Sequence, residues 1–177
     1  TYTTTCSITD RVSNSQTLST TYNVEGTGVG SSSGGGSSTT SGALEQKSTK
    51  FVEINPGTPA LVKNFDEDYG LKEISISVNT KATDVKISVS RFNGNPPSGV
   101  SAKSGKVYKY LEIKQEKLDG KLASATITIK VGKSWVNANG LSKDDVIISK
   151  LINGAWKELS TSYKEEDASN YYYTTNV

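Results

Sequence analysis

Apolar and polar residues alternate along several short stretches of the chain, with the two-residue period of strands that are buried on one face. The clearest stretches carry apolar residues at every second position over 74–78, 85–89 and 125–131. Weaker stretches with strand character cover 50–54, 59–64, 106–114, 146–152, 155–160 and 169–175. The pattern predicts antiparallel strands with one buried and one solvent-exposed face.

Turn sequences separate these predicted strands, because Gly, Pro, Asn and Asp gather at 55–59, 93–99, 119–120, 139–140 and 153–154. Many short strands with such turns and no regular helices between them predict an all-β fold, an antiparallel Ig-like β-sandwich. The one helical signal is 140–146, where Ser142 is expected to cap a single turn. Trp135 and Trp156 are expected to anchor the core, each with a partner for its indole N–H.

The first 26 residues repeat the two-residue alternation in two stretches, 1–12 and 17–25. In both stretches the odd positions are mostly hydroxyl-bearing or polar. The even positions form a partly apolar face, made of Tyr2, Thr4, Cys6, Ile8, Asp10 and Val12 in the first stretch and Leu18, Thr20, Tyr22 and Val24 in the second. Residues 13–16 between them suit a turn. The segment is predicted to be a flexible β-arm, either a hairpin or a donor strand.

Gly, Ser and Thr dominate residues 27–43, a composition typical of a flexible linker. The chain is therefore divided into an arm at 1–26, a linker at 27–43 and a β-sandwich domain at 44–177. An isolated hairpin is only marginally stable in water, so the arm needs another surface. Three alternatives remain open: the arm pairs with a sheet edge of a neighbouring copy, folds back on its own domain, or stays disordered.

Composition narrows the classes of function. The 177 residues hold 20 basic and 18 acidic side chains, interspersed, which gives no basic patch for nucleic acid. No run approaches the about 18 apolar residues of a membrane span. The absence of His removes His-based catalytic triads and the usual zinc sites, and the single Cys gives no disulfide framework. We expect a protein that is not an enzyme and holds no cofactor.

Localisation is predicted from the first residue. Thr1 stands where a cytosolic chain normally has Met, and no Met occurs anywhere, which favours a processed N-terminus. The protein is therefore expected to be extracellular, either secreted or held at the cell surface.

A few polar and aromatic groups are candidate sites. Asp66 and Asp68, within 64–70, are a calcium candidate, with a solvated loop as the alternative. The tyrosines at 171–173 form either a stacking platform for sugar or part of the core or an interface. Cys6 is interpreted as a buried thiol, with an intermolecular disulfide as the alternative. The acidic run at 165–167 is expected to be exposed without a specific role.

Residues 51–175 resemble the PGF-pre-PGF domain of archaeal surface proteins. The likeness lies in the order of six segments: FVEINPGTPA at 51–60, LKEISISVN at 71–79, DVKISVSRFNGNPPSG at 84–99, VYKYLEIK at 107–114, ATITIKVGKSWV at 125–136 and LINGAWKEL at 151–159. The resemblance implies an extracellular archaeal protein. That family continues past its Tyr-rich strand with a further apolar strand, whereas this sequence stops at Val177. The departure predicts an open sheet edge after Val177 that the arm of another copy fills.

Together these expectations favour a structural subunit of an extracellular archaeal filament or surface layer, assembled as a homopolymer by donation of the arm to a neighbouring subunit. Other cell-surface proteins or glycans are further expected partners. The expected interface residues are Tyr2, Thr4, Cys6, Ile8, Val12, Leu18, Tyr22, Val24, Tyr171 and Tyr173. The alternative is a carbohydrate-binding or adhesive surface module.

Overall fold

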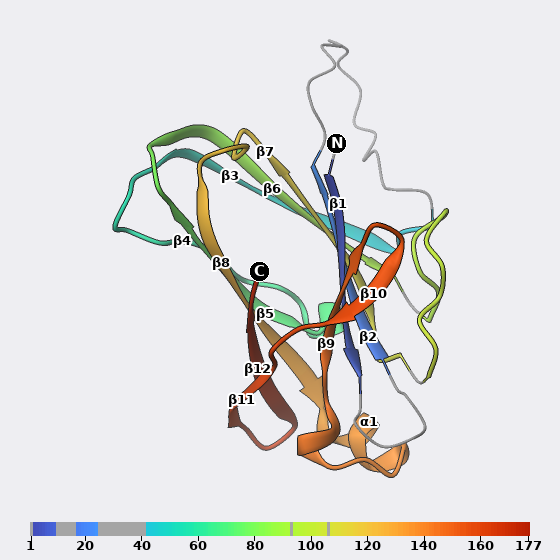
Figure 1. Ribbon diagram of the computed structural model, residues 1–177. Coiled ribbons are helices and arrows are strands. Elements are labelled where there is room, and N and C mark those ends of the chain that lie inside the picture. Colours follow the sequence, from blue (N-terminus) through green and yellow to red (C-terminus); the bar gives the residue numbers. More distant parts are fainter. Residues whose placement is uncertain (1, 10–16, 25–41, 93, 106) are drawn as a thin grey trace.

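The computed structural model describes residues 2–9, 17–24, 42–92, 94–105 and 107–177. Within this part of the chain lie twelve β-strands, one short α-helix and two single 3-10 turns (Figure 1). The prediction of a mostly β chain with antiparallel sheets is confirmed, because the strands form two sheets in which nearly all neighbours are antiparallel.

The larger sheet has seven strands in the order β10-β9-β1-β2-β7-β6-β3. Its members are β1 (Tyr2–Thr9), β2 (Thr17–Val24), β3 (Glu45–Ile54), β6 (Ala82–Phe92), β7 (Tyr110–Glu116), β9 (Ile148–Ile152) and β10 (Ala155–Glu158). Neighbours in this order are antiparallel except β2 and β7, which run parallel. The first two strands of the chain thus lie in the middle of the sheet.

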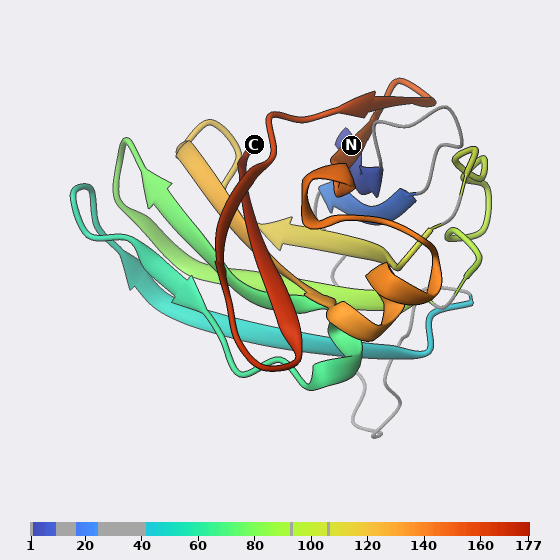
Figure 2. The ribbon, with the colours of Figure 1, turned by 90° about the horizontal axis from the view of Figure 1, so that it is seen from below.

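The smaller sheet has five strands in the order β11-β12-β8-β5-β4, all antiparallel to their neighbours. Its members are β4 (Ala60–Val62), β5 (Leu71–Val78), β8 (Leu122–Gly132), β11 (Ser162–Glu166) and β12 (Asn170–Asn176). Figure 2 shows the strands of both sheets from a second direction.

One hydrophobic core draws side chains from both sheets. The predicted alternation holds on β5, where Ile74, Ile76 and Val78 are buried. On β6 and β8 the expectation of a solvent-exposed second face is wrong, because Ser88, Ser90, Thr128 and Lys130 are buried as well. Ser88 and Ser90 have side-chain partners on β3, and Lys130 pairs with Glu67. Ser88 Oγ lies 2.7 Å from Ser48 Oγ on β3, for example.

Two elements were not expected from the pattern. The helix α1 (Lys133–Ala138) follows β8 directly and carries Trp135, which packs partly buried against the core. Strand β11 occupies an edge and all its residues are exposed, so its sequence lacks the apolar alternation that marks the other strands. The expected turn is confirmed: Ser142 and Asp145 form a capping box on the 3-10 turn η2 (Lys143–Asp145).

Trp156 on β10 does not belong to the core as expected, but it has the expected partner for its indole N–H. Its Nε1 donates to the carbonyl of Ser101 at 2.9 Å, and its ring lies 6.0 Å from that of Tyr110. Trp156 therefore ties the segment before β7 to the edge strand. In the part of the chain that the structure describes, no helix has the length and apolar character needed to cross a bilayer.

Candidate subunit interface

The two N-terminal strands form an antiparallel hairpin. Tyr2 stands opposite Val24, and the register continues without a shift to Ile8 opposite Leu18 and Thr9 opposite Thr17. Of the two arrangements expected for the arm, the hairpin is therefore the one observed. Val12, expected at the interface, lies outside the described residues.

The hairpin lies between β7 and β9 of the same chain (Figures 1 and 2). β2 pairs in parallel with β7 from Ser19 opposite Tyr110 to Val24 opposite Gln115. β1 pairs with β9 through Thr5 opposite Leu151 and Ser7 opposite Ser149. We call the space between β7 and β9 the hairpin slot. Within one chain, then, the arm folds back on its own domain.

The register decides which face of the sheet each hairpin position joins, because directly paired residues of neighbouring strands lie on the same face. Thr20 is paired with Leu111, Tyr22 with Ile113 and Leu18 with Ile148. These three partners belong to the buried core, each at most 1% exposed.

The even-numbered positions of the hairpin therefore lie on the core side of the sheet. They include Tyr2, Thr4, Cys6 and Ile8 by the β1–β2 register. This is the stripe that the alternation singled out. The hydroxyl-rich odd positions join the opposite face, as Ser7 beside Ser149 indicates.

The slot has two sides that need a partner. Without the hairpin, the facing backbone groups of β7 and β9 would have no strand beside them in the described sheet. Unpaired strand edges of this kind template pairing with another chain. Core residues such as Leu111 and Ile148 sit on these two strands, and the hairpin completes the hydrogen-bonded ladder between them.

The predicted docking edge after Val177 is not where the hairpin lies. β12 is flanked by β8 on one side and β11 on the other, in the smaller sheet. Val177 extends this pairing: its N–H donates to the carbonyl of Ala125 at 2.9 Å and its carbonyl accepts from the Ala125 N–H at 3.3 Å. The expectation failed because strand neighbours are not readable from the position of a strand in the chain.

The tyrosines of β12 lie away from the slot. Tyr173 is buried in the core, and its hydroxyl donates to the carbonyl of Lys143 at 2.8 Å; burial raises its pKa. Tyr171 is half-buried and packs against the same core. Tyr172 lies on the opposite face, where Lys72 Nζ stands 4.2 Å from its ring centroid.

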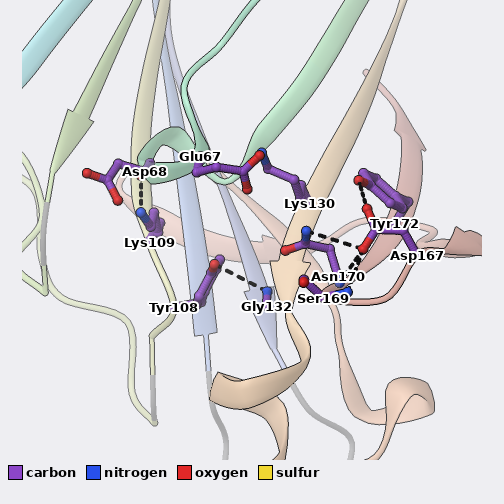
Figure 3. A network of polar contacts seen from close by, with 10 residues as sticks. All are labelled: Glu67, Asp68, Tyr108, Lys109, Lys130, Gly132, Asp167, Ser169, Asn170 and Tyr172. Atoms are coloured by element: carbon purple, nitrogen blue, oxygen red, sulfur yellow. Dashed lines mark hydrogen bonds and ion pairs between the residues drawn. The ribbon is translucent and has the colours of Figure 1, made fainter.

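The segment expected to bind calcium is held by cations of the protein itself (Figure 3). Asp68 Oδ2 lies 3.8 Å from Arg91, and its carbonyl accepts a hydrogen bond from Lys109. Glu67 Oε1 lies 2.6 Å from the Nζ of Lys130. Among the described residues no group of three or more metal-ligating side chains gathers. Asp66 precedes the 3-10 turn η1 (Glu67–Tyr69), and its carbonyl accepts from the Tyr69 N–H.

The same view shows a carboxylate that organises the turn between β11 and β12 (Figure 3). Asp167 Oδ1 accepts from the N–H groups of Ser169 and Asn170, each at 2.7 Å, and Oδ2 accepts from the Tyr172 hydroxyl at 2.5 Å. Chiefly through the Tyr172 bond, the pKa of Asp167 falls to about 2, and that of Tyr172 rises to about 12. These bonds fix a turn within the chain.

No family model, curated protein or solved structure matches the chain. The resemblance to the PGF-pre-PGF domain therefore stays a prediction, and the functional argument rests on the hairpin and its slot.

Proposed function

We propose that the protein is a structural subunit of an extracellular filament or surface layer, in which the hairpin of one copy fills the slot between β7 and β9 of the next. In this proposal the two sheets form an Ig-like β-sandwich that the donated hairpin completes. The observation that carries the proposal is the register, because it sets the even-numbered arm positions beside the core residues Leu111, Ile113 and Ile148.

Docking within one chain and donation between chains would use the same pairs. They differ only in the path of the 20 residues, 25–44, that join β2 to β3. Exchange of an identical element between copies is a low-cost route to assembly. Donation from each copy to the next is a heterologous contact, which propagates into a filament unless its rotation closes a ring.

The length of this connection allows both paths. The register aligns Val24 on β2 with Gln115 on β7, Ile87 on β6 and Thr49 on β3. Strand β3 therefore lies three strand spacings from β2, and its first residue, Glu45, lies four residues along β3 from Thr49. With about 3.3 Å per residue and about 4.8 Å between strands, the gap is about 20 Å. Twenty extended residues reach about 66 Å. The connection can therefore close on its own slot or extend to a neighbour.

Because the pairs are the same, the balance between the two states depends on concentration. The covalent tether keeps the hairpin near its own slot at an effective concentration in the mM range. A filament then forms where copies are crowded or where further contacts between copies add to the exchanged hairpin. A closed monomer in dilute solution and a polymer at high concentration are both expected.

A shortened connection tests the proposal. Deletion of 25–41 leaves three residues between Val24 and Glu45, and their four Cα–Cα steps span at most about 15 Å, less than the gap of about 20 Å. The hairpin then cannot reach its own slot, and we expect filaments at concentrations where the parent chain is monomeric. Electron microscopy and light scattering measure this. The matched control replaces 25–41 by a Gly/Ser segment of equal length and should behave as the parent.

A shortened variant that stays monomeric, with its hairpin unprotected in hydrogen exchange, would contradict donation. A second measurement uses the parent connection. Asn23 and Lys114 are register partners, so Asn23→Cys with Lys114→Cys, in a Cys6→Ser background, should cross-link hairpin to slot. Donation gives a covalent ladder on a non-reducing gel, whereas docking within one chain gives only a monomer. A monomer alone, even in assembled material, would refute the proposal.

A further inference from the structure

A cleft of about 400 Å³ lies between η2, the residues that lead into β9, and the end of β10 with the segment that follows it. Its other wall is formed by β11 and β12 of the smaller sheet. The side chains that give it chemical character are Lys143, Asp144, Glu158, Ser160, Tyr163 and Tyr173. The volume is within the range of small-molecule sites in proteins.

Tyr163 supplies an accessible aromatic ring in this cleft. It stands on the edge strand β11 and is 40% exposed, among the most exposed large apolar or aromatic residues in the described chain. Its ring is held edge-on against Tyr173, with centroids 6.0 Å apart and planes at 73°, and Lys143 Nζ lies 4.7 Å from its centroid. Tyr173 is itself fixed by its bond to the Lys143 carbonyl. Tyr171 also lies against this ring, with centroids 6.5 Å apart. A partly exposed ring held in one orientation suits stacking of a flat apolar surface on the part that Lys143 leaves open.

Hydrogen-bonding groups surround this ring. Asp144 and Glu158 line the cleft, and among the described residues no hydrogen bond or ion pair engages their carboxylates, while Lys103 interacts with Glu158 electrostatically. Thr161 has a different role, because its hydroxyl accepts from the Ile148 N–H and donates to the Leu159 carbonyl. The cleft wall is thus held by internal bonds, while two carboxylates stay available to a ligand.

An aromatic face beside paired acceptors matches the chemistry of a sugar ring, which presents C–H groups on its face and hydroxyl donors at its rim. Two carboxylates against one ammonium give the lining a net charge of −1, which disfavours acidic sugars. We infer that this cleft binds a neutral oligosaccharide, with Tyr163 stacking on one sugar ring and Asp144 and Glu158 accepting its hydroxyl protons. The inference does not depend on assembly through the hairpin.

The test uses the full chain and four trisaccharide probes: cellotriose, mannotriose, triacetylchitotriose and trigalacturonate. Saturation-transfer NMR detects binding, and calorimetric titration gives its affinity. At least one neutral probe should bind, and trigalacturonate should not. Tyr163→Ala should weaken that binding about tenfold or more, whereas Tyr163→Phe should retain it, because stacking needs the ring and not the hydroxyl. Glu158→Gln should also weaken it.

Exposed Leu61 lies on β4 at the far edge of the smaller sheet, so Leu61→Ala is the matched control and should leave binding unchanged. Absence of binding by every neutral probe overturns the inference, and so does equal binding by Tyr163→Ala. If Tyr163→Ala alters polymerisation while oligosaccharide binding is absent, the cleft is a contact between copies and the inference fails.

Discussion

Asp167 illustrates how single side chains decide local structure in this protein. One carboxylate satisfies two backbone N–H groups and the Tyr172 hydroxyl, so it closes the turn between β11 and β12. The exposed acidic run was expected to have no specific role, and for Asp167 that expectation is wrong. The residue type suits a turn, but its bond to Tyr172 depends on the folded strand pair.

The low pKa of Asp167 makes this turn sensitive to acid. A folded-state pKa of about 2, below the ordinary 3.8, means that the stabilisation is present above about pH 4 and is lost as the pH falls through 2. We expect Asp167→Asn to be less stable than the parent at pH 7, with the difference shrinking between pH 4 and pH 2. Urea unfolding at several pH values measures this. Glu166→Gln is the control, and an unchanged difference at pH 2 would count against the assignment.

The Glu67–Lys130 pair joins a buried cation to an exposed anion: the Lys130 side chain is 8% exposed and that of Glu67 80%. Removing the anion leaves a buried ammonium without its partner. We expect Glu67→Ala to lower the free energy of unfolding by about 1–2 kcal/mol. Lys130→Met, which removes the buried charge, should cost less or nothing. Chemical denaturation of both variants decides this, and a costlier Lys130→Met would contradict the reasoning.

Among the secondary-structure elements, the connection between η1 and β5 depends on one glycine. Gly70 has φ +63°, caps η1 and donates its N–H to the Glu67 carbonyl. A Cβ there would meet Tyr108 Cε1 at 3.2 Å and Lys109 Cδ at 3.3 Å. The turn therefore needs both the left-handed backbone and the missing side chain.

Gly70→Ala should destabilise the protein more than a glycine substitution in open space. Gly57 has a similar φ of +82°, and a Cβ there meets nothing within 4 Å. We expect about 1 kcal/mol for Gly57→Ala from backbone strain alone and about 2 kcal/mol for Gly70→Ala. Thermal unfolding of both compares them. Equal losses would show that contacts with Tyr108 and Lys109 add nothing.

The strands themselves divide into those that the sequence predicted and those that it did not. β5, β6 and β8 were expected because each buries alternate residues such as Ile74, Ile87 and Ile129. β11 was not, since an edge strand with both faces exposed needs no apolar alternation. α1 follows β8 without a turn signal, and its six residues are too few to establish a helical period.

For the whole molecule, the hairpin is expected to stabilise the domain in whichever chain it docks. Deletion of 1–24 should lower the midpoint of thermal unfolding and increase aggregation, because β7 and β9 lose their neighbours. A synthetic peptide of 1–24 added in excess should restore the midpoint. A peptide with Leu18→Asp and Tyr22→Asp should not, since both positions lie on the core side of the register. Full stability without any hairpin would contradict this role.

The candidate sites also divide into those that the sequence predicted and those that it did not. The arm was predicted as an interface for two reasons. Its apolar and polar residues alternate strongly, and a Gly/Ser-rich stretch separates it from the domain, so the sequence shows no obvious partner for its apolar positions. The cleft beside Tyr163 was not found, because its lining comes from five separate runs of residues between Lys143 and Tyr173 that only the fold brings together. The prediction of a calcium site at Asp66 and Asp68 did not include the cationic side chains of Arg91, Lys109 and Lys130. These residues are distant in sequence, and the fold brings them to Asp68 and Glu67.

The two-residue period of the sequence is enough to indicate that the chain is mostly antiparallel β and that the arm has one apolar stripe, because this period records which side of a strand is buried. It did not determine which strands become neighbours. The folded chain shows that the hairpin lies between β7 and β9 and that β12 is paired on both sides. The physical reason is that strand pairing joins distant residues through backbone groups common to every residue, so the choice depends on how the whole core closes.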